Sequence, residues 1–246
     1  MLHNDWVILD EAQSTNDVAF ELMSKNKAGH FTTIFAHTQL YGRGQQLSVW
    51  ESESRQNINM SVILLPYNMQ IQHLHFLTMI CSLSIAITLE KILKENVSIK
   101  WPNDIIINDH KIAGVLIENI IQGNEIMGSV MGIGINVNQT HFLPYTPPAT
   151  SLHLITGVQH KTLDIAANVV GKIKELYDYF LHNNRAEIKK MYMSKLYRLN
   201  TPSMFYLKDE LLIGTIYDVN DFGLLCINFE NGNQHVFAPK ELKYYY

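Results

Sequence analysis

The segment KWPNDIIINDHKIAGVLIEN, residues 100–119, has two β-rich runs separated by a tight turn. Isoleucine and valine favour strands, and the polar sequence NDH (108–110) is typical of a turn. We therefore predict a β-hairpin. Asp104 and Lys111 lie at the two ends of its first strand and turn, so the hairpin would bring their side chains near one another. A lysine and an aspartate beside a turn are more often a solvated surface pair, so this segment alone does not define a functional site.

Further strands and helices flank this hairpin on both sides. β-Branched and aromatic runs predict strands over residues 6–10, 32–38, 58–65 and 125–138. Apolar periodicity and capping residues predict helices over about 14–25, 73–94, 161–182 and 184–196. From residue 198 onward, short strands and turns predict a small β-barrel of about five strands. We therefore predict two domains, residues 1–197 with an α+β fold and residues 198–246 with an all-β fold.

Composition narrows the class of protein. Apolar residues make up 47% of the 246 residues, charged residues make up 17%, and the formal net charge is −4. This balance excludes a strongly basic protein that holds duplex nucleic acid non-specifically through its phosphates. Cys81 and Cys226 lie far apart in apolar surroundings with no CxxC pair, which is typical of buried reduced thiols in a cytoplasmic protein.

One segment has the composition of a membrane span. Residues 74–89 contain no Asp, Glu, Lys or Arg. They are too few to cross a bilayer, because a spanning helix needs about 20 consecutive apolar residues. We therefore predict a buried core helix and no association with a membrane.

Two glycine-rich segments are candidates for ligand contact. The loop GRGQQLSVW (42–50) can bring backbone N–H groups together around an anion, and Arg43 adds a guanidinium suited to carboxylate or phosphate. In GIGINVN (132–138), glycines within a strand are typical of close approach by a ligand or another backbone. Taken alone, each segment is more often an ordinary turn or a closely packed strand.

Together and in this order, the motifs resemble the biotin protein ligases, also called biotin–[acetyl-CoA-carboxylase] ligases. The series is STND (14–17), GRG…W (42–50), KWPND (100–104), KIAGVLIE (111–118) and GIGIN (132–136). The resemblance implies a mixed sheet flanked by helices, as in class II synthetases, with a C-terminal SH3-like β-domain. It also implies that biotin and ATP, with Mg²⁺ carried by ATP and no metal held by the protein, form biotinyl-5′-AMP and pyrophosphate. Biotin then passes to a lysine of a biotin carboxyl carrier domain.

The resemblance also implies roles for individual residues. Lys111, with Arg43 and Asp104, would be catalytic, and Lys111 would touch both the biotin carboxylate and the α-phosphate. Asp104 would orient the amine of the carrier lysine or relay its proton. The positions matching biotin contacts are Ser14, Thr15, Gln39, Gly42, Arg43, Lys111, Gly114 and Gly132. The positions matching contacts with ATP or the adenylate are Gly44, Gln45, Trp50, Lys100, Asn103, Asn136 and Lys243.

The chain departs from the family pattern in two places. The common glycine loop runs Gly-Arg-Gly-Arg-Arg-Gly-Arg-x-Trp, whereas this chain has Gln45, Gln46 and Leu47 in place of two arginines and the third glycine. Many bacterial members carry a DNA-binding winged helix before the ligase, whereas 13 residues precede Ser14 here. With the negative net charge, this predicts neither DNA binding nor a repressor role.

Three questions stay open at this level. A lipoate or octanoate transferase with the same fold is an alternative enzyme, to be tested with lipoate and ATP. A non-catalytic biotin-binding module is an alternative of another class, indicated only by the altered glycine loop. The protein is either a monomer or a homodimer, because sheet edges in the family pair with another protomer or with the carrier.

The altered loop generates a first prediction. A hydrogen bond to a charged group contributes about 1.5–3 kcal/mol, so a loop without these arginines should hold biotinyl-adenylate less tightly than an arginine-rich relative. Replacing Gln45→Arg should lengthen the lifetime of the enzyme-bound adenylate, measured by its release from a filtered complex. An unchanged lifetime would contradict this hypothesis, and packing of Leu47 on the ligand would then be the alternative explanation.

Overall fold

The computed structural model describes residues 5–45, 48–65, 69–208 and 210–246. Gln46 and Leu47 of the glycine loop lie outside these residues. The helices are α1 (Thr15–Ser24), α2 (Leu74–Leu93), α3 (Leu152–Thr156), α4 (Thr162–Leu181) and α5 (Arg185–Ser194), with a 3₁₀ turn η2 (Ile71–His73) before α2. The strands before residue 140 are β1 (Trp6–Ala12), β2 (Thr33–Gln39), β3 (Gly42–Arg43), β4 (Val49–Trp50), β5 (Ile58–Leu64), β6 (Met69–Gln70), β7 (Ser98–Lys100), β8 (Asp104–Ile107), β9 (His110–Gln122) and β10 (Glu125–Ile135).

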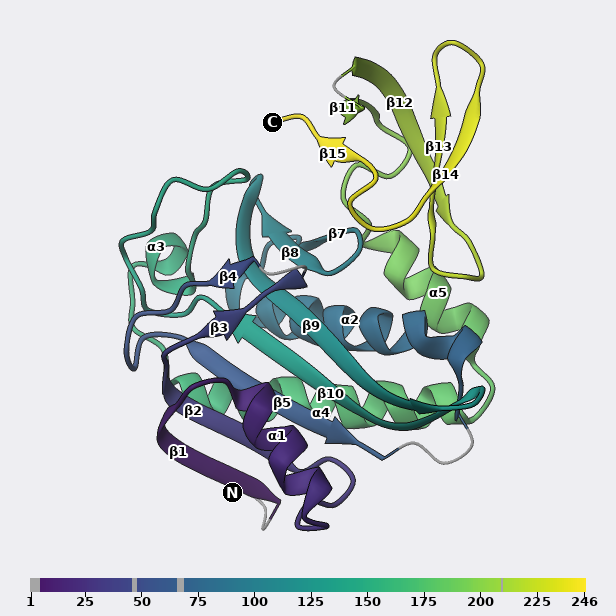
Figure 1. The fold of residues 1–246 in the computed structure, drawn as a ribbon. Helices are drawn as coiled ribbons and strands as arrows, with labels where there is room; N and C mark the ends of the chain where they lie inside the picture. Colours follow the sequence, from purple (N-terminus) through teal and green to yellow (C-terminus); the bar gives the residue numbers. More distant parts are fainter. Residues whose placement is uncertain (1–4, 46–47, 66–68, 209) are drawn as a thin grey trace.

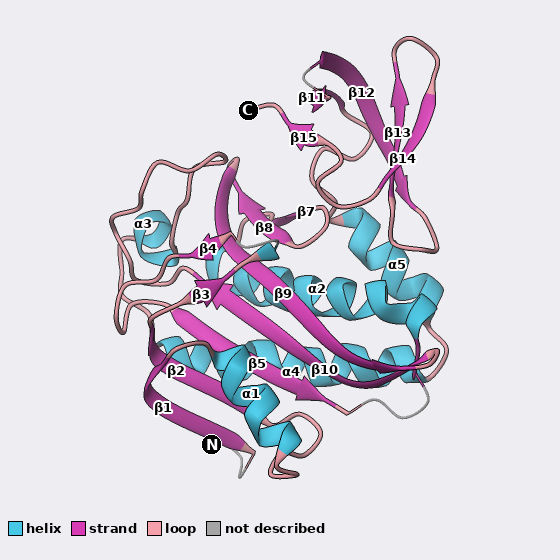
Figure 2. Cartoon of the chain, in the orientation of Figure 1, coloured by secondary structure: helices cyan, strands magenta, loops and turns pink. Residues whose placement is uncertain are grey.

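A central mixed sheet organises most of the chain (Figure 1). Its strand order is β1-β2-β5-β10-β9-β8-β7, with β6 beside β10. Strands β1 and β2 are parallel, and the other neighbours are antiparallel. Figure 2 shows α2 and α4 behind the sheet and α1 in front of it. The predicted mixed sheet flanked by helices is therefore confirmed.

Helix α2 forms the centre of the larger hydrophobic core. Residues Ile71–Leu93 are long and apolar enough to cross a membrane by length and composition, but 67% of the most apolar window is buried inside the protein. Leu77 and Ile80 are fully buried, and they belong to the same cluster as Ile133 of β10. This burial confirms the core helix that was predicted from the uncharged segment 74–89.

A smaller core lies on the other face of the sheet, under α1. It contains Ala19 of α1 with Ile34, Ile63 and Val130 from three neighbouring strands. Because this cluster seats α1 on the sheet, the polar residues at the start of that helix lie beside β5 and β10. The cluster therefore fixes one wall of the functional site.

The C-terminal part of the chain folds as a separate antiparallel sheet of five strands. They are β11 (Pro202–Leu207), β12 (Glu210–Val219), β13 (Leu225–Phe229), β14 (Gln234–Phe237) and β15 (Lys243–Tyr244), in the order β14-β13-β12-β11-β15. The predicted number of strands is confirmed, and the arrangement agrees with an SH3-like fold. The indole N–H of Trp101 donates to the carbonyl of Gly223 at 3.0 Å, which ties this C-terminal sheet to the segment between β7 and β8.

Two local features were not predicted. The glycine loop is a short hairpin, since β3 and β4 pair Gly42 with Trp50 and Arg43 with Val49. Helix α3 begins after Ser151, whose hydroxyl caps it by accepting from the N–H of Leu154 at 3.2 Å. Both elements are shorter than the windows from which periodicity can be recognised.

The position of α2 generates a prediction about stability. Replacing Leu77→Ala should lower the free energy of unfolding by about 2–5 kcal/mol, because the deletion removes buried methyl groups and leaves a cavity. Replacing the exposed Lys91→Ala in the same helix should change it by less than about 0.5 kcal/mol. Urea unfolding followed by circular dichroism measures both, and equal midpoints for the two variants would contradict the core position of α2.

Candidate functional site

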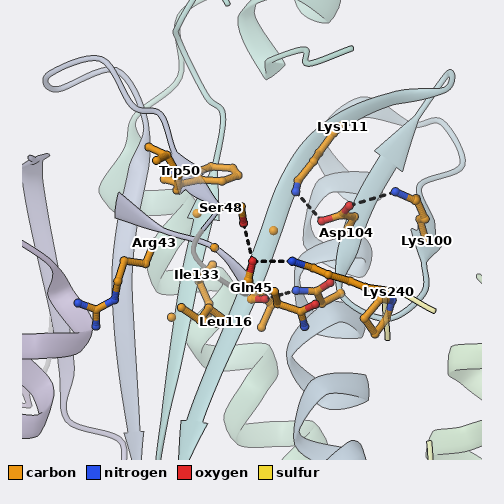
Figure 3. A pocket seen from close by; sticks show the side chains of 18 of the residues that line it. Arg43, Gln45, Ser48, Trp50, Lys100, Asp104, Lys111, Leu116, Ile133 and Lys240 are labelled. Carbon is orange, nitrogen blue, oxygen red and sulfur yellow. Dashed lines mark hydrogen bonds and ion pairs between the residues drawn. The ribbon is translucent and has the colours of Figure 1, made fainter. Parts of the chain in front are cut away.

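A pocket of about 500 Å³ lies over β9 and β10, between the glycine loop and the C-terminal segment (Figure 3). Most residues predicted for the site line it, and they arrive from distant parts of the chain. They are Ser14, Thr15, Gln39, Arg43, Gly44, Gln45, Trp50, Lys100, Asn103, Asp104, Lys111, Gly114, Gly132 and Lys243. The structure therefore brings together the separate sequence motifs in one cavity.

Asp104 lies between two lysines at one end of the pocket. Its carboxylate is 2.5 Å from Nζ of Lys111 on β9 and 3.4 Å from Nζ of Lys100 on β7. The predicted approach of Asp104 and Lys111 across the hairpin is thus observed. All three side chains are largely shielded, with exposed fractions of 19% for Asp104, 30% for Lys111 and 15% for Lys100. One carboxylate shared by two ammonium groups leaves this end of the pocket positive.

Burial affects the ammonium group of Lys100. Removal from water lowers the pKa of its ammonium group, and the nearby Asp104 carboxylate opposes part of that shift. The ammonium also lies over the rings of Tyr244 and Tyr246, with Nζ at 5.2 Å and 5.5 Å from their centroids. Two aromatic faces from the C-terminal segment therefore cover a cation of the N-terminal sheet.

The opposite end of the pocket is lined by neutral polar groups. The backbone N–H and the hydroxyl of Thr15 both donate to Oε1 of Gln39, at 2.9 and 3.2 Å. The Ser61 hydroxyl lies 2.7 Å from the Thr15 hydroxyl and 2.6 Å from Oδ1 of Asn16. Ser14 is buried, and its side chain does not cap α1. Hydroxyl and amide groups can here satisfy a ligand that has both donors and acceptors but no charge.

Bare glycine backbone makes room for Trp50 between these two ends. A Cβ atom at Gly134 would collide with the indole, and one at Gly114 would lie 3.4 Å from the same ring. Nζ of Lys111 is 5.8 Å from the centroid of the indole ring, and the buried indole N–H has no hydrogen-bond partner among the residues that the structure describes. At Gly132, a Cβ would lie 2.5 Å from Oδ1 of Asn16. The glycines of β9 and β10 therefore allow close approach of the Trp50 and Asn16 side chains. The predicted close approach of a ligand at these glycines stays a prediction.

Comparison with known proteins identifies the group to which this chain is related. Residues 9–136 match the model of the biotin/lipoate A/B protein ligase family. The chain belongs to this family. It is 28% identical over 232 residues to the bifunctional ligase/repressor BirA of Bacillus spizizenii, covering 93% of this chain and 71% of that protein. It is 24% identical over 230 residues to the biotin–[acetyl-CoA-carboxylase] ligase of Mycobacterium tuberculosis, covering 91% and 84% of the two chains.

Solved structures of family members agree with this assignment. The biotin protein ligase of Aquifex aeolicus in complex with biotin and ATP superposes with a TM-score of 0.81 at 27% identity, covering 99% of this chain and 100% of that chain. The same ligase without ligands superposes with a TM-score of 0.75 at 25% identity, over 97% of each chain. The resemblance to biotin protein ligases that the motifs indicated is confirmed.

Arg43 has a different environment from the one expected for a phosphate-binding residue of this ligase family. Its guanidinium forms a bidentate pair with Asp17 of α1, at 2.9 and 2.6 Å, and lies 3.6 Å from Glu118 of β9. The hydrogen bonds that the guanidinium donates to Asp17 raise the pKa of Arg43 further above its ordinary value. In Figure 3 the side chain points away from Lys111 and Asp104. Contact with a ligand carboxylate or phosphate would require exchange of these partners.

Two predicted residues of the ligase site do not line the pocket. The buried side-chain amide of Asn136 donates to the carbonyl of Thr150 at 3.0 Å, so it fastens the end of β10 to a neighbouring loop. Gly42 lies in the β3–β4 hairpin, where a Cβ would collide with the carbonyl of Trp50. Contacts of these two residues with ligands stay predictions.

Several pocket residues were missed by sequence reasoning. Asn16 lies within the STND motif and lines the pocket, and its amide donates to Glu118 at 2.6 Å. Lys240, Tyr244 and Tyr246 also line the pocket, from the C-terminal segment. Asn16 was detectable from its motif, whereas the C-terminal residues belong to a segment of short strands and turns without a local ligand-binding pattern.

The packing of Trp50 on glycine generates a prediction. Replacing Gly134→Ala should lower the free energy of unfolding by about 1–3 kcal/mol or displace the indole, because the new methyl group occupies the space of the ring. Replacing Gly171→Ala in α4, where a Cβ meets nothing within 4 Å, should stabilise the helix by about 0.8–1 kcal/mol. Thermal unfolding and near-ultraviolet circular dichroism measure the two effects. A Gly134→Ala variant that matches wild type in both would show that the indole does not rest on β10.

Proposed function

We propose that this protein is an ATP-dependent biotin protein ligase. It joins biotin to ATP, forming biotinyl-5′-AMP and pyrophosphate, and then transfers biotin to a lysine of a biotin carboxyl carrier domain of acetyl-CoA carboxylase or a related carboxylase. The observation that carries the proposal is the Lys111–Asp104 pair at the charged end of a pocket whose other end is neutral and polar. Likeness along nearly the whole chain to a ligase that binds biotin and ATP supports it. We expect the reaction in the cytoplasm, where ATP and the carrier are present.

The first step brings two anions together. A carboxylate oxygen of biotin forms a bond to the α-phosphorus of ATP, while the bond to the bridging oxygen of pyrophosphate breaks. Lys111 lies between the anions and neutralises charge that builds up in the transition state, which is where an electrostatic contact accelerates a reaction. Lys100 adds a second positive charge beside Asp104.

The neutral end of the pocket suits the ureido ring of biotin. This ring offers two N–H donors and one carbonyl acceptor and carries no charge. Ser14, Thr15 and Gln39 provide hydroxyl and amide groups of both kinds. Trp50 would pack near the adenine in this proposal.

In the second step, the amine of the carrier lysine attacks the acyl carbon of biotinyl-5′-AMP. The bond from that carbon to the phosphate oxygen breaks, AMP leaves, and the nitrogen loses a proton. The free amine has a pKa of about 10.4, so its proton must be removed before attack. Asp104 orients this amine and accepts or relays the proton.

Magnesium enters with the nucleotide in this proposal. Among residues 5–45, 48–65, 69–208 and 210–246, no three His, Cys, Asp or Glu side chains are arranged to hold a metal ion. In this proposal phosphate oxygens of ATP would hold the ion, where it would supply further neutralisation of charge.

The test is pyrophosphate release with biotin, Mg²⁺-ATP and a purified biotin carboxyl carrier domain. Wild type should release pyrophosphate and label one carrier lysine. Replacing Lys111→Ala should lower kcat/KM by about 10²–10³-fold, the usual cost of removing one transition-state donor. The exposed Lys91→Ala, remote from the pocket, is the matched control and should keep wild-type activity.

The outcomes separate the competing functions. Turnover with lipoate and ATP but none with biotin would assign the alternative transferase. Biotin binding without pyrophosphate release would assign a non-catalytic module. Full activity of the Lys111→Ala variant would contradict the central role of this lysine while leaving the ligase activity itself intact.

A further inference from the structure

Positive charge in the pocket is compensated unevenly. Five cationic side chains line it, namely Arg43, Lys100, Lys111, Lys240 and Lys243. Arg43 is paired with Asp17, and the two lysines of the N-terminal sheet share Asp104. Within the part of the chain that the structure describes, neither Lys240 nor Lys243 has a carboxylate at ion-pair distance. Apart from the one positive charge left where two lysines share Asp104, the uncompensated charge of the pocket therefore comes from the C-terminal segment.

Lys240 directs its charge to the glycine loop. Its Nζ donates to the backbone carbonyl of Gln45 at 2.7 Å, and the same carbonyl accepts from the hydroxyl of Ser48 at 2.8 Å. Figure 3 shows the Lys240 side chain extended across the pocket to this point. Gln45 is the position at which the common loop of biotin protein ligases has an arginine. A cation from the C-terminal segment therefore lies beside a loop position that has no charge of its own.

We propose that Lys240 supplies the phosphates of ATP with the positive charge that the glycine loop lacks at Gln45. This inference rests on the proposed ligase function and deepens it by naming a residue that determines nucleotide affinity. An ammonium group has three N–H donors, so the bond to the Gln45 carbonyl leaves two for phosphate oxygens. The bond to the loop also holds the ammonium in place before the nucleotide binds, which reduces the ordering required on binding.

A purely structural role for Lys240 makes different predictions. If the lysine only tethers the loop, any group that restores the tether is sufficient, and the charge at position 45 is irrelevant. A loosened loop would also disturb biotin, because Arg43 and Trp50 belong to the same hairpin. If Lys240 instead supplies charge to the phosphates, its loss should raise the KM for ATP and leave the KM for biotin unchanged.

The experiment measures the KM values for ATP and for biotin from pyrophosphate release. Replacing Lys240→Met keeps side-chain length without charge, and we expect the KM for ATP to rise about 10-fold or more, as for a lost bond to a charged group. The KM for biotin should stay unchanged, and Lys240→Arg should keep the wild-type KM for ATP. Lys208→Met is the matched control. Like Lys240, Lys208 is an exposed turn residue of the C-terminal segment with a positive φ, but it does not line the pocket.

A charge swap gives the decisive comparison. Adding Gln45→Arg to Lys240→Met returns the cation to the loop and should restore the KM for ATP. Absence of rescue in a variant with wild-type thermal stability would overturn the inference, as would a parallel rise in both KM values or no change in Lys240→Met. If wild type itself releases no pyrophosphate from biotin and ATP, the proposed function fails, and that result is distinct from an active wild type with an unaffected Lys240→Met.

Discussion

The carboxylate of Asp104 pairs with both lysines at the charged end of the pocket. Asp104 is the first residue of β8, directly opposite Lys100 in its pairing with β7. On the other side, a register irregularity between β8 and β9 falls next to Lys111, and such a bulge re-aims a side chain. Two strand pairings thus converge on Asp104. Without its charge, two lysines would lie close together and shielded from water, where like charges are costly.

The pocket separates charge from neutral polarity along its length. Lys111 and Asp104 occupy one end, Thr15 and Gln39 occupy the other, and Trp50 lies between them. This division matches a ligand with a neutral ring at one end and an anionic group at the other. Glycines on β9 and β10 make the division possible, because any Cβ at Gly134 would occupy the space of the indole. The pattern of bare backbone is therefore as important to the site as the charged residues.

The C-terminal sheet completes the pocket as well as packing beside it. Tyr244 and Tyr246 cover the ammonium of Lys100, whose pKa is lowered by burial. Lys240 reaches the glycine loop from the same segment. The shape and charge of the pocket thus depend on how the C-terminal segment docks on the central sheet.

Local patterns in the chain predicted most of the helices and strands and the approach of Asp104 to Lys111 across the β8–β9 hairpin, but neither α3 nor the β3–β4 hairpin. These features depend on local periodicity, turn residues and short motifs, which act over a few positions. Only the tertiary structure decided that Arg43 is held by Asp17 and Glu118, that Trp50 rests on Gly134, and that Lys240 bonds to the loop. The last contact joins residues 195 positions apart. Such contacts follow from how the sheets and α1 pack together, and no local pattern in the chain encodes them.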